Sequence, residues 1–130
     1  MNIKRFNSGS EFENRIGYSR AVDDGRYVFV SGTTGYDYQS MQIESCVKAQ
    51  TIQCFKNIEL ALKAVEVNLI DVLRVRYILA DADDFEACWP IMRQYLGQAK
   101  PAATLIIADL MNDEIKIEIE VMATSKANNN

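Results

Sequence analysis

Residues 73–79, with the sequence LRVRYIL, decide the fold class of this 130-residue chain. Their side chains alternate with a period of two, which predicts a β-strand with one apolar and one charged face. The apolar face would carry Leu73, Val75, Tyr77 and Leu79, and the charged face Arg74 and Arg76. Because such a strand is covered on only one side, we expect helices to pack against one face of a sheet.

Amphipathic helices are predicted on both sides of this strand. Upstream, apolar or small side chains recur at helical spacing from Ser45, which we expect to be the N-cap, to Val65. Downstream, acidic residues 81–84 suit a helix N-terminus, and apolar residues repeat at helical spacing from Phe85 until Gly97. The central strand is therefore flanked by two helices in the sequence.

The first part of the chain predicts a β-hairpin and an edge strand. Residues 18–21 lead through the turn residues 23–25, Asp-Asp-Gly, into the aromatic and β-branched run 26–31. Residues 2–6 are a candidate edge strand. These segments supply three strands before the first helix.

The last part of the chain predicts a second hairpin. Residues 102–110 and 115–124 are strand-like and are separated by residues 111–114. The predicted order is then β-β-β-α-β-α-β-β, an α+β fold with a six-stranded mixed sheet and two helices on one face. Because two helices cannot cover both faces of such a sheet, we expect a homo-oligomer.

The length and composition predict one domain, which we place at residues 1–125. The chain has 48% hydrophobic and 25% charged residues, values that are typical of globular proteins. Residues 126–130 end in three asparagines and are expected to form a frayed polar tail.

The charge and the hydropathy pattern exclude several classes of partner. The net charge of −4 gives no basic surface for nucleic acid, so we expect no such partner. There is no apolar run of transmembrane length and no signal-peptide pattern at the start, so we predict a cytoplasmic protein without membrane contact.

The chain contains no histidine, which removes the commonest general base and the commonest metal ligand. Its three cysteines, Cys46, Cys54 and Cys88, show no CxxC spacing and lie within helical patterns. We therefore predict no metal site and no disulfide, and we interpret the cysteines as buried thiols. Any catalysis would have to use other groups.

Three stretches in order resemble the YjgF/Rid family. They are Ile16-Gly17-Tyr18, Val28-Phe29-Val30-Ser31-Gly32 and Lys116-Ile117-Glu118-Ile119-Glu120-Val121, and the pair Pro101-Ala102 also matches. The resemblance implies a chorismate-mutase-like (YjgF-type) fold assembled as a homotrimer. It further implies small-molecule pockets at the subunit interfaces, no cofactor, and hydrolysis of reactive imines or enamines to carbonyl compounds and ammonia.

The resemblance makes Glu118 the candidate catalytic residue. One carboxyl group that handles a proton and positions water can suffice for attack on a carbon–nitrogen double bond, and burial would raise its pKa toward a useful range. The alternative interpretation is that Glu118 and Glu120 form the solvated face of an amphipathic strand.

The same resemblance implies that Tyr18, Gly32 and Thr33 contribute to substrate binding. Tyr18 would be a pocket wall, although it directly follows Gly17, where the family commonly has a proline before the tyrosine. Gly32 is interpreted either as a hinge at a strand end or as a place where a ligand approaches the backbone.

The main departure from the family lies after Pro101. Family deaminases have Pro-Ala-Arg-Ser, in which the arginine holds the substrate carboxylate, whereas this chain has Ala103 and Thr104 at the last two positions. Neither side chain can reproduce a bidentate guanidinium, so standard 2-imino acids should bind poorly.

Four further residues bear on substrate binding. Trp89 stands where family deaminases tend to carry asparagine, and it is interpreted either as a ligand contact or as a core or interface residue. A replacement cation could come from Arg20, Arg74 or Arg76, although exposed arginines are usually solvated or paired with acids.

Three functions stay open. The first is hydrolysis of an imine or enamine that is not a standard 2-imino acid, with Glu118 as the catalytic group. The second is a noncatalytic trimer that binds a small ligand. The third is endoribonuclease activity, which the acidic composition and the lack of histidine make the least favoured.

Overall fold

The computed structural model describes residues 2–128. Three α-helices interrupt the series of strands within these residues, and three short 3-10 turns lie between or after the strands and helices. The strands are β1 Lys4–Phe6, β2 Ala21–Asp23, β3 Tyr27–Thr34, β4 Tyr36–Asp37, β5 Gln42–Ile43, β6 Val72–Leu79, β7 Ala102–Ile107 and β8 Ile117–Thr124. The helices are α1 Glu11–Ile16, α2 Val47–Ala64 and α3 Phe85–Leu96, and the 3-10 turns are Leu69–Asp71, Ala82–Asp84 and Lys126–Asn128.

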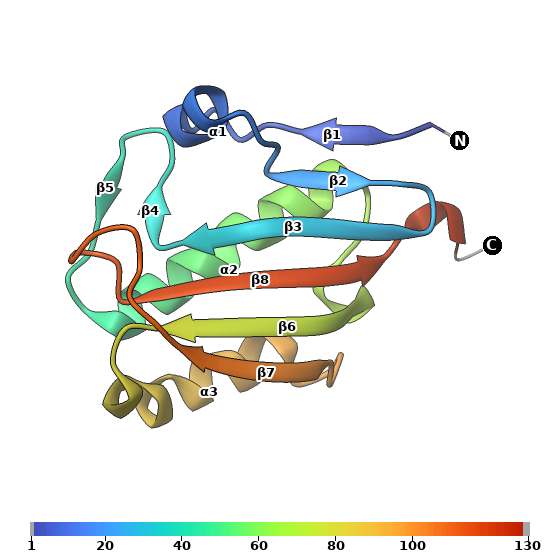
Figure 1. The fold of residues 1–130 in the computed structure, drawn as a ribbon. Coiled ribbons are helices and arrows are strands. Elements are labelled where there is room, and N and C mark those ends of the chain that lie inside the picture. The colour runs from blue at the N-terminus through green and yellow to red at the C-terminus, as the bar shows by residue number, and fades with distance from the viewer. Residues whose placement is uncertain (1, 129–130) are drawn as a thin grey trace.

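Six of the strands form one mixed sheet in the order β1-β2-β3-β8-β6-β7. All neighbouring pairs are antiparallel except β6 and β7, which are parallel because α3 connects them as a crossover. The two long helices, α2 and α3, lie behind the sheet in Figure 1 and leave its front face open. The predicted α+β architecture and the edge strand at residues 2–6 are confirmed.

The main core lies between this sheet and the two long helices. Alternate residues of β8 are buried, and Ile117 and Ile119 pack toward the apolar stripe of α2, which includes Phe55 and Ile58. This burial of apolar surface is the main favourable term for the fold. No helix within residues 2–128 combines the length and the apolar character that a membrane span requires.

The predicted second hairpin is wrong. Strand β7 ends at Ile107 and pairs only with β6, whereas β8 lies between β3 and β6. Residues 108–116 cross back over the sheet end instead of forming a tight turn. The alternating burial of β8 explains its central place, because an edge position would leave the row from Ile117 to Ala123 partly exposed.

The prediction that Leu73 lies on the covered face is also wrong. Its side chain is 48% exposed, while Val75, Tyr77 and Leu79 are buried as expected. The register of β6 against β8 shifts between Val72 and Arg74, which is a β-bulge. A bulge adds one unpaired residue and redirects its side chain, and this places Val72 rather than Leu73 in the core.

The start of α2 and one cysteine differ from the predictions. The N-cap is Cys46 rather than Ser45, because the Cys46 carbonyl accepts the first helical hydrogen bond, from the Gln50 N–H at 2.9 Å. This position at the helix start leaves Cys46 exposed, whereas Cys54 and Cys88 are buried thiols as expected.

Two elements were not predicted from the sequence. The short hairpin of β4 and β5 follows the end of β3, and α1 fills the segment before Tyr18. The Ser10 hydroxyl caps α1 by accepting a hydrogen bond from the Phe12 N–H, and Gly17 ends the helix with a φ of 94°. That left-handed conformation favours glycine and turns the chain toward the sheet.

Candidate functional site

Three predicted site residues line one small pocket at the end of the sheet where β8 begins. Tyr18, Gly32 and Glu118 face a hollow of ≈ 70 Å³, and side chains of α1 and of the 108–116 segment, including Phe12 and Met111, complete its rim. Apolar and aromatic walls around one carboxyl group are a common composition for a small-molecule site. This pocket is therefore the candidate site.

Glu118 and Gly32 are in direct contact. A β-carbon built on Gly32 would collide with the Glu118 carboxylate, whose Oε2 atom occupies the space above the glycine. Glu118 stands on β8 opposite Thr34 of β3 and Ile78 of β6, on the sheet face opposite the two long helices. The absence of a side chain at position 32 therefore provides the room in which the carboxyl group lies.

Burial raises the pKa of Glu118 above its ordinary value. The nearby carboxylate of Glu120 raises it further, and the positive charge of Arg20 acts in the opposite direction. A carboxyl group with a raised pKa keeps its proton at higher pH than an ordinary carboxyl group does, which favours a role in proton transfer.

A bulge in β3 brings Gly32 to this position. Between Val30 and Thr33 the pairing of β3 with β8 loses one residue of register, so Ser31 and Gly32 bow out of the ladder. The Ser31 hydroxyl donates to the Ser19 carbonyl at 2.6 Å, and its N–H donates to the Arg20 carbonyl at 2.9 Å. These bonds fix the bulge against the segment that precedes β2.

Arg20 lies directly behind the bulge and is 1% exposed, so of the two expected states, solvated or paired with an acid, it adopts the paired one, in a buried place. Its Nη1 donates to the Gly32 carbonyl at 2.8 Å and to the Thr33 hydroxyl at 3.2 Å. Its Nε forms an ion pair with Glu13 at 3.2 Å, and both side chains are buried. Glu13 therefore balances the Arg20 charge within the chain, and the burial of the guanidinium leaves it little surface for a substrate carboxylate.

Two tyrosine rings lie close to the Arg20 guanidinium. Its Cζ lies 4.5 Å from the centre of the Tyr38 ring and 5.6 Å from that of Tyr18. The Tyr38 hydroxyl accepts a hydrogen bond from the Thr34 N–H at 2.9 Å, and burial raises the pKa of Tyr38. Cation–π contacts of this kind hold both rings in place as pocket walls.

The Thr33 side chain points away from the pocket. It is fully buried, and its hydroxyl accepts from Arg20 and donates to the Ser31 carbonyl at 2.7 Å. Its carbonyl accepts from the Cys54 thiol at 3.4 Å. Within one chain Thr33 therefore supports Gly32 from behind, and a direct contact with substrate stays a prediction.

Ala103 and Thr104 lie apart from Glu118 within one chain. Ala103 pairs with Val75, on the helix-covered face of the sheet, whereas Glu118 pairs with Ile78 on the opposite face. Thr104 is on the open face and its hydroxyl accepts a hydrogen bond from Arg74 Nη2 at 2.9 Å. A pocket that used both Ala103 and Glu118 would need a second copy of the chain.

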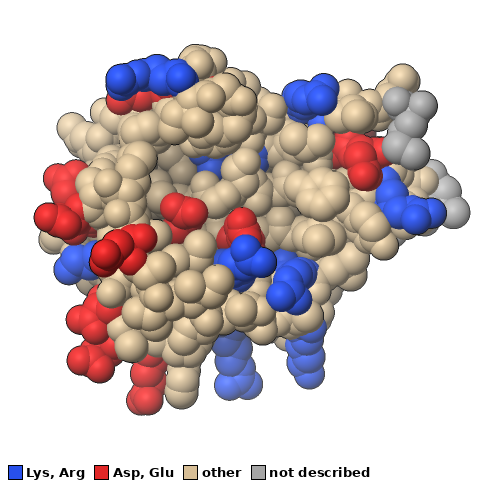
Figure 2. Space-filling model, viewed as in Figure 1, with Lys and Arg blue, Asp and Glu red and all other residues tan. Residues whose placement is uncertain are grey.

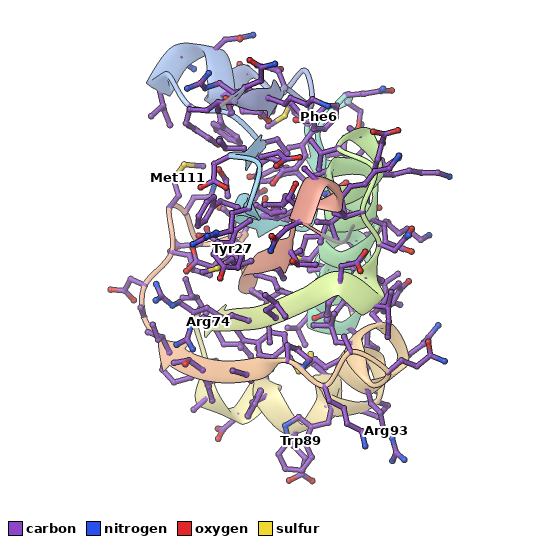
Figure 3. All side chains as sticks on the ribbon, turned by 90° about the vertical axis from the view of Figure 1, so that its right-hand side faces the viewer. Phe6, Tyr27, Arg74, Trp89, Arg93 and Met111 are labelled. Atoms are coloured by element: carbon purple, nitrogen blue, oxygen red, sulfur yellow. The ribbon has the colours of Figure 1, made fainter. Side chains whose placement is uncertain are left out.

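Trp89 is also distant from the candidate pocket. It is 50% exposed, packs edge-on against Phe85 with ring centres 5.7 Å apart, and projects outward from α3 in Figure 3. It is not a core residue of the single chain. The interface and ligand-contact interpretations both stay predictions.

The remaining candidate cations lie on the open face of the sheet. Arg76 forms an ion pair with Glu120 at 2.8 Å, and Arg74 bonds to Thr104. Figure 3 shows Arg74 on the side of the sheet away from α2. Arg76 Nε is buried without a hydrogen-bond partner among the described residues.

Sequence reasoning missed Glu13, the buried partner of Arg20. A signal was present, because Ser10 and Glu13 have the S-x-x-E spacing that marks a helix start. In the structure the Glu13 carboxylate instead accepts hydrogen bonds from the N–H and hydroxyl of Ser8 and from Arg20. The pairing of the two charges depends on the fold and has no sequence signature.

A larger hollow of ≈ 590 Å³ lies between α2 and the β4–β5 hairpin, with Tyr38 as a shared wall. Within residues 2–128 no cluster of three side chains suited to hold a metal ion is present. The raised pKa of Glu118 and its place in the candidate pocket suit proton transfer by this group.

A family model described as Endoribonuclease L-PSP matches residues 9–125, a span that includes both Gly32 and Glu118. The chain belongs to the YjgF/Rid family. The YjgF/Rid resemblance of the three sequence stretches is thereby confirmed.

Relatives and solved structures agree with this YjgF/Rid membership. A 2-iminobutanoate/2-iminopropanoate deaminase from Homo sapiens is 32% identical over 93% of this chain and 90% of its own length. A RutC family protein from Pyrococcus horikoshii is 32% identical over 82% of this chain and 85% of its own length. The structure of a YjgF/YER057c/UK114 family member from Mycobacterium tuberculosis superposes with a TM-score of 0.86 at 32% identity, covering 95% of this chain and 99% of that chain.

Proposed function

We propose that this protein hydrolyses a reactive imine or enamine to a carbonyl compound and ammonia, with Glu118 as the catalytic group. The observation that carries the proposal is the position of the Glu118 carboxyl group, which lies against Gly32 in a pocket and has a raised pKa. A relative that is 32% identical over 93% of this chain is named an imine deaminase, which supports the same reaction class.

The reaction needs one group that first gives and then takes a proton. Protonated Glu118 donates to the imine nitrogen, which makes the carbon electrophilic, and water adds to that carbon. The carboxylate accepts the proton released by the attacking water and returns it to the nitrogen as ammonia leaves. It then takes the remaining hydroxyl proton as the carbonyl forms, which restores protonated Glu118. The net reaction consumes one water per imine and requires no redox partner.

The complete site is proposed to form between subunits of a homotrimer. The candidate pocket of one chain, at ≈ 70 Å³, is smaller than the few hundred cubic ångströms that ligand sites usually occupy. The open face of the sheet also carries apolar groups without cover in the described chain, including Phe29 at 42% exposure and Ile106. A partner subunit would cover this face and enlarge the pocket.

The substrate is proposed to differ from a standard 2-imino acid. Position 103 carries alanine, and Arg20, the cation whose charge acts on Glu118, is buried and paired with Glu13. The site of one chain therefore offers no free guanidinium for a carboxylate. Neutral or apolar imines are the expected substrates.

A noncatalytic ligand-binding trimer is the second candidate, and Ala103 is the observation that favours it. Endoribonuclease activity is the weakest candidate, although the family model bears that name. Figure 2 shows acidic and basic side chains interspersed with uncharged surface on the open face, without the broad basic patch that an RNA backbone would require.

The test is ammonia release from imines generated in situ by an amino-acid oxidase. Imines with acidic, neutral and apolar side chains would be compared in the presence and absence of the protein. Faster release with neutral or apolar imines than with acidic ones supports the proposal. Saturable binding of these compounds or their products without faster release would favour the ligand-binding alternative.

A further inference from the structure

The buried ion pair of Glu13 and Arg20 lies on the far side of Gly32 from the Glu118 carboxylate. The Arg20 side chain contacts five groups within the chain, which are the Gly32 carbonyl, the Thr33 hydroxyl, the Glu13 carboxylate and the side chains of Tyr18 and Tyr38. Buried charges are costly unless they are paired and hydrogen-bonded, so such a network at this place calls for a role.

The pair is oriented with respect to Glu118. The guanidinium of Arg20 bonds directly to the Gly32 carbonyl, and Gly32 touches the Glu118 carboxylate. Glu13 binds the opposite side of the guanidinium through Nε and is anchored by Ser8 at the start of the α1 segment. The positive end of the pair therefore lies nearer to Glu118 than the negative end does.

The groups that face Glu118 from neighbouring elements have different effects. The carboxylate of Glu120, on the same strand, disfavours ionisation of Glu118, but it is itself paired with Arg76 of β6. From α2, the buried Cys54 thiol lies under Thr33 and feels the charge of Glu118. The remaining titratable groups around the pocket are Tyr18 and Tyr38.

Among the groups that influence the ionisation of Glu118, Arg20 carries the positive charge, and it lies behind the Gly32 bulge. Burial and Glu120 both disfavour the charged form of Glu118, and the Arg20 charge favours it. A group that acts as both acid and base must be able to change between its protonated and ionised forms. The Arg20 charge therefore affects how readily Glu118 can do so.

We propose that Arg20 is a positioning residue for Glu118, and that the buried Glu13–Arg20 pair holds the Gly32 bulge against the carboxyl group and presents fixed positive charge behind it. The effect of this arrangement on catalysis rests on the proposed function. The influence of the Glu13–Arg20 pair on the ionisation of Glu118 can be measured in the absence of any substrate.

The experiment is a direct titration of the Glu118 carboxyl carbon by NMR in the free protein. In Arg20→Gln the positive charge is lost, so the midpoint of Glu118 should shift upward. Arg15→Gln is the matched control, because Arg15 is an exposed arginine of α1 whose loss changes the net charge equally. The control should leave the Glu118 midpoint unchanged.

The partner substitution should act in the opposite direction. In Glu13→Gln the Arg20 charge is no longer neutralised, so the Glu118 midpoint should shift downward. Where a single substitution prevents folding, the double variant Glu13→Gln/Arg20→Gln removes both charges and still offers hydrogen-bonding amides. Because the positive end of the pair is the nearer one, the double variant should show a smaller upward shift.

Arg20→Lys separates charge from positioning. Lysine keeps the positive charge but cannot bind both the Gly32 carbonyl and the Thr33 hydroxyl as the guanidinium does. Amide hydrogen exchange of residues 31–33 should therefore accelerate. The Glu118 midpoint should move less than in Arg20→Gln, because the charge is kept. A Glu118 midpoint that is the same in wild type, Arg20→Gln and the double variant would overturn the inference. The expected shifts without any imine turnover would support the inference and count against the proposed function.

Discussion

The carboxylate of Glu118 occupies the space that a β-carbon on Gly32 would need. The two residues come from different strands, β8 and β3, and meet because the β3 bulge displaces residue 32 from the regular ladder. The glycine is therefore required for the position of the carboxyl group rather than for an unusual backbone conformation. Substitutions at position 32 should therefore affect catalysis more than the stability of the fold.

Gly32→Ala should displace Glu118 without unfolding the protein. The obstructing atoms are the end of a flexible side chain, which can turn away, so the free energy of unfolding should change by less than about 1 kcal/mol. Ammonia release should fall by about 100-fold or more, because the catalytic group has lost its position. Chemical denaturation and steady-state kinetics on the same preparation would test this.

Gly35→Ala is the matched comparison with the opposite outcome. There a β-carbon would lie 2.7 Å from the Cα atom of Gln50, and helix backbone cannot turn away. The substitution should destabilise the protein by about 1–3 kcal/mol and leave the turnover of the folded fraction intact. Equal losses of turnover in the two variants would contradict the role assigned to Gly32.

The raised pKa of Glu118 predicts that Glu118→Gln stabilises the protein in a pH-dependent manner. Below the pKa of glutamate in the unfolded chain, about 4.3, both states of the wild type are protonated and the two proteins should be similar. As pH rises, the unfolded wild type ionises first, so the wild type loses stability relative to the variant until the folded pKa is passed. Denaturation between about pH 4 and 8 measures this difference, and a constant difference would contradict it.

Ala103→Arg should restore binding of carboxylate-bearing imines. A guanidinium at this position would supply the bidentate, charge-assisted contact that alanine lacks, so kcat/KM for a 2-imino acid should rise by about tenfold or more. Ala103→Gln is the control for size without charge. If the two variants behave alike with acidic and neutral imines, position 103 does not face the substrate.

The three cysteines should differ sharply in reactivity. Backbone N–H groups of Ala49 and Lys48 at the start of α2 lower the pKa of the exposed Cys46 thiol, whereas burial raises the pKa of Cys54 and Cys88. Iodoacetamide at neutral pH should therefore modify Cys46 alone in the folded protein. Mass spectrometry after brief labelling reads this directly, and modification of Cys54 under these conditions would contradict the packing.

Local patterns in the sequence were sufficient to predict most elements but not their pairing. The alternation in residues 117–124 predicts a strand, yet only the fold reveals that β8 separates β3 from β6. A hairpin was the simplest expectation for two neighbouring strand-like segments, and the crossover through α3 overrides it. The prediction for the Leu73 side chain is wrong for a similar reason, because a bulge has no sequence signature in an alternating run.

The candidate site was also predicted only in part, because motifs can be read from the sequence but contacts between distant segments cannot. Tyr18, Gly32 and Glu118 come from motifs that are matched in order, and the structure gathers them around one pocket. The buried contact of Arg20 with Glu13 joins residues from two elements and could not be read from either. The relation of Ala103 and Trp89 to the pocket depends on a neighbouring subunit and stays a prediction.

The most direct test of the central claim compares Glu118→Gln with Glu120→Gln on the imine that wild type hydrolyses fastest. Both variants replace a carboxylate by an amide on the same strand, but Glu120 is paired with Arg76 and does not line the pocket. The account predicts that Glu118→Gln, while folded, lowers ammonia release by about 100-fold or more and that Glu120→Gln retains most of it. Undiminished release in folded Glu118→Gln would contradict the assignment of Glu118 as the catalytic group.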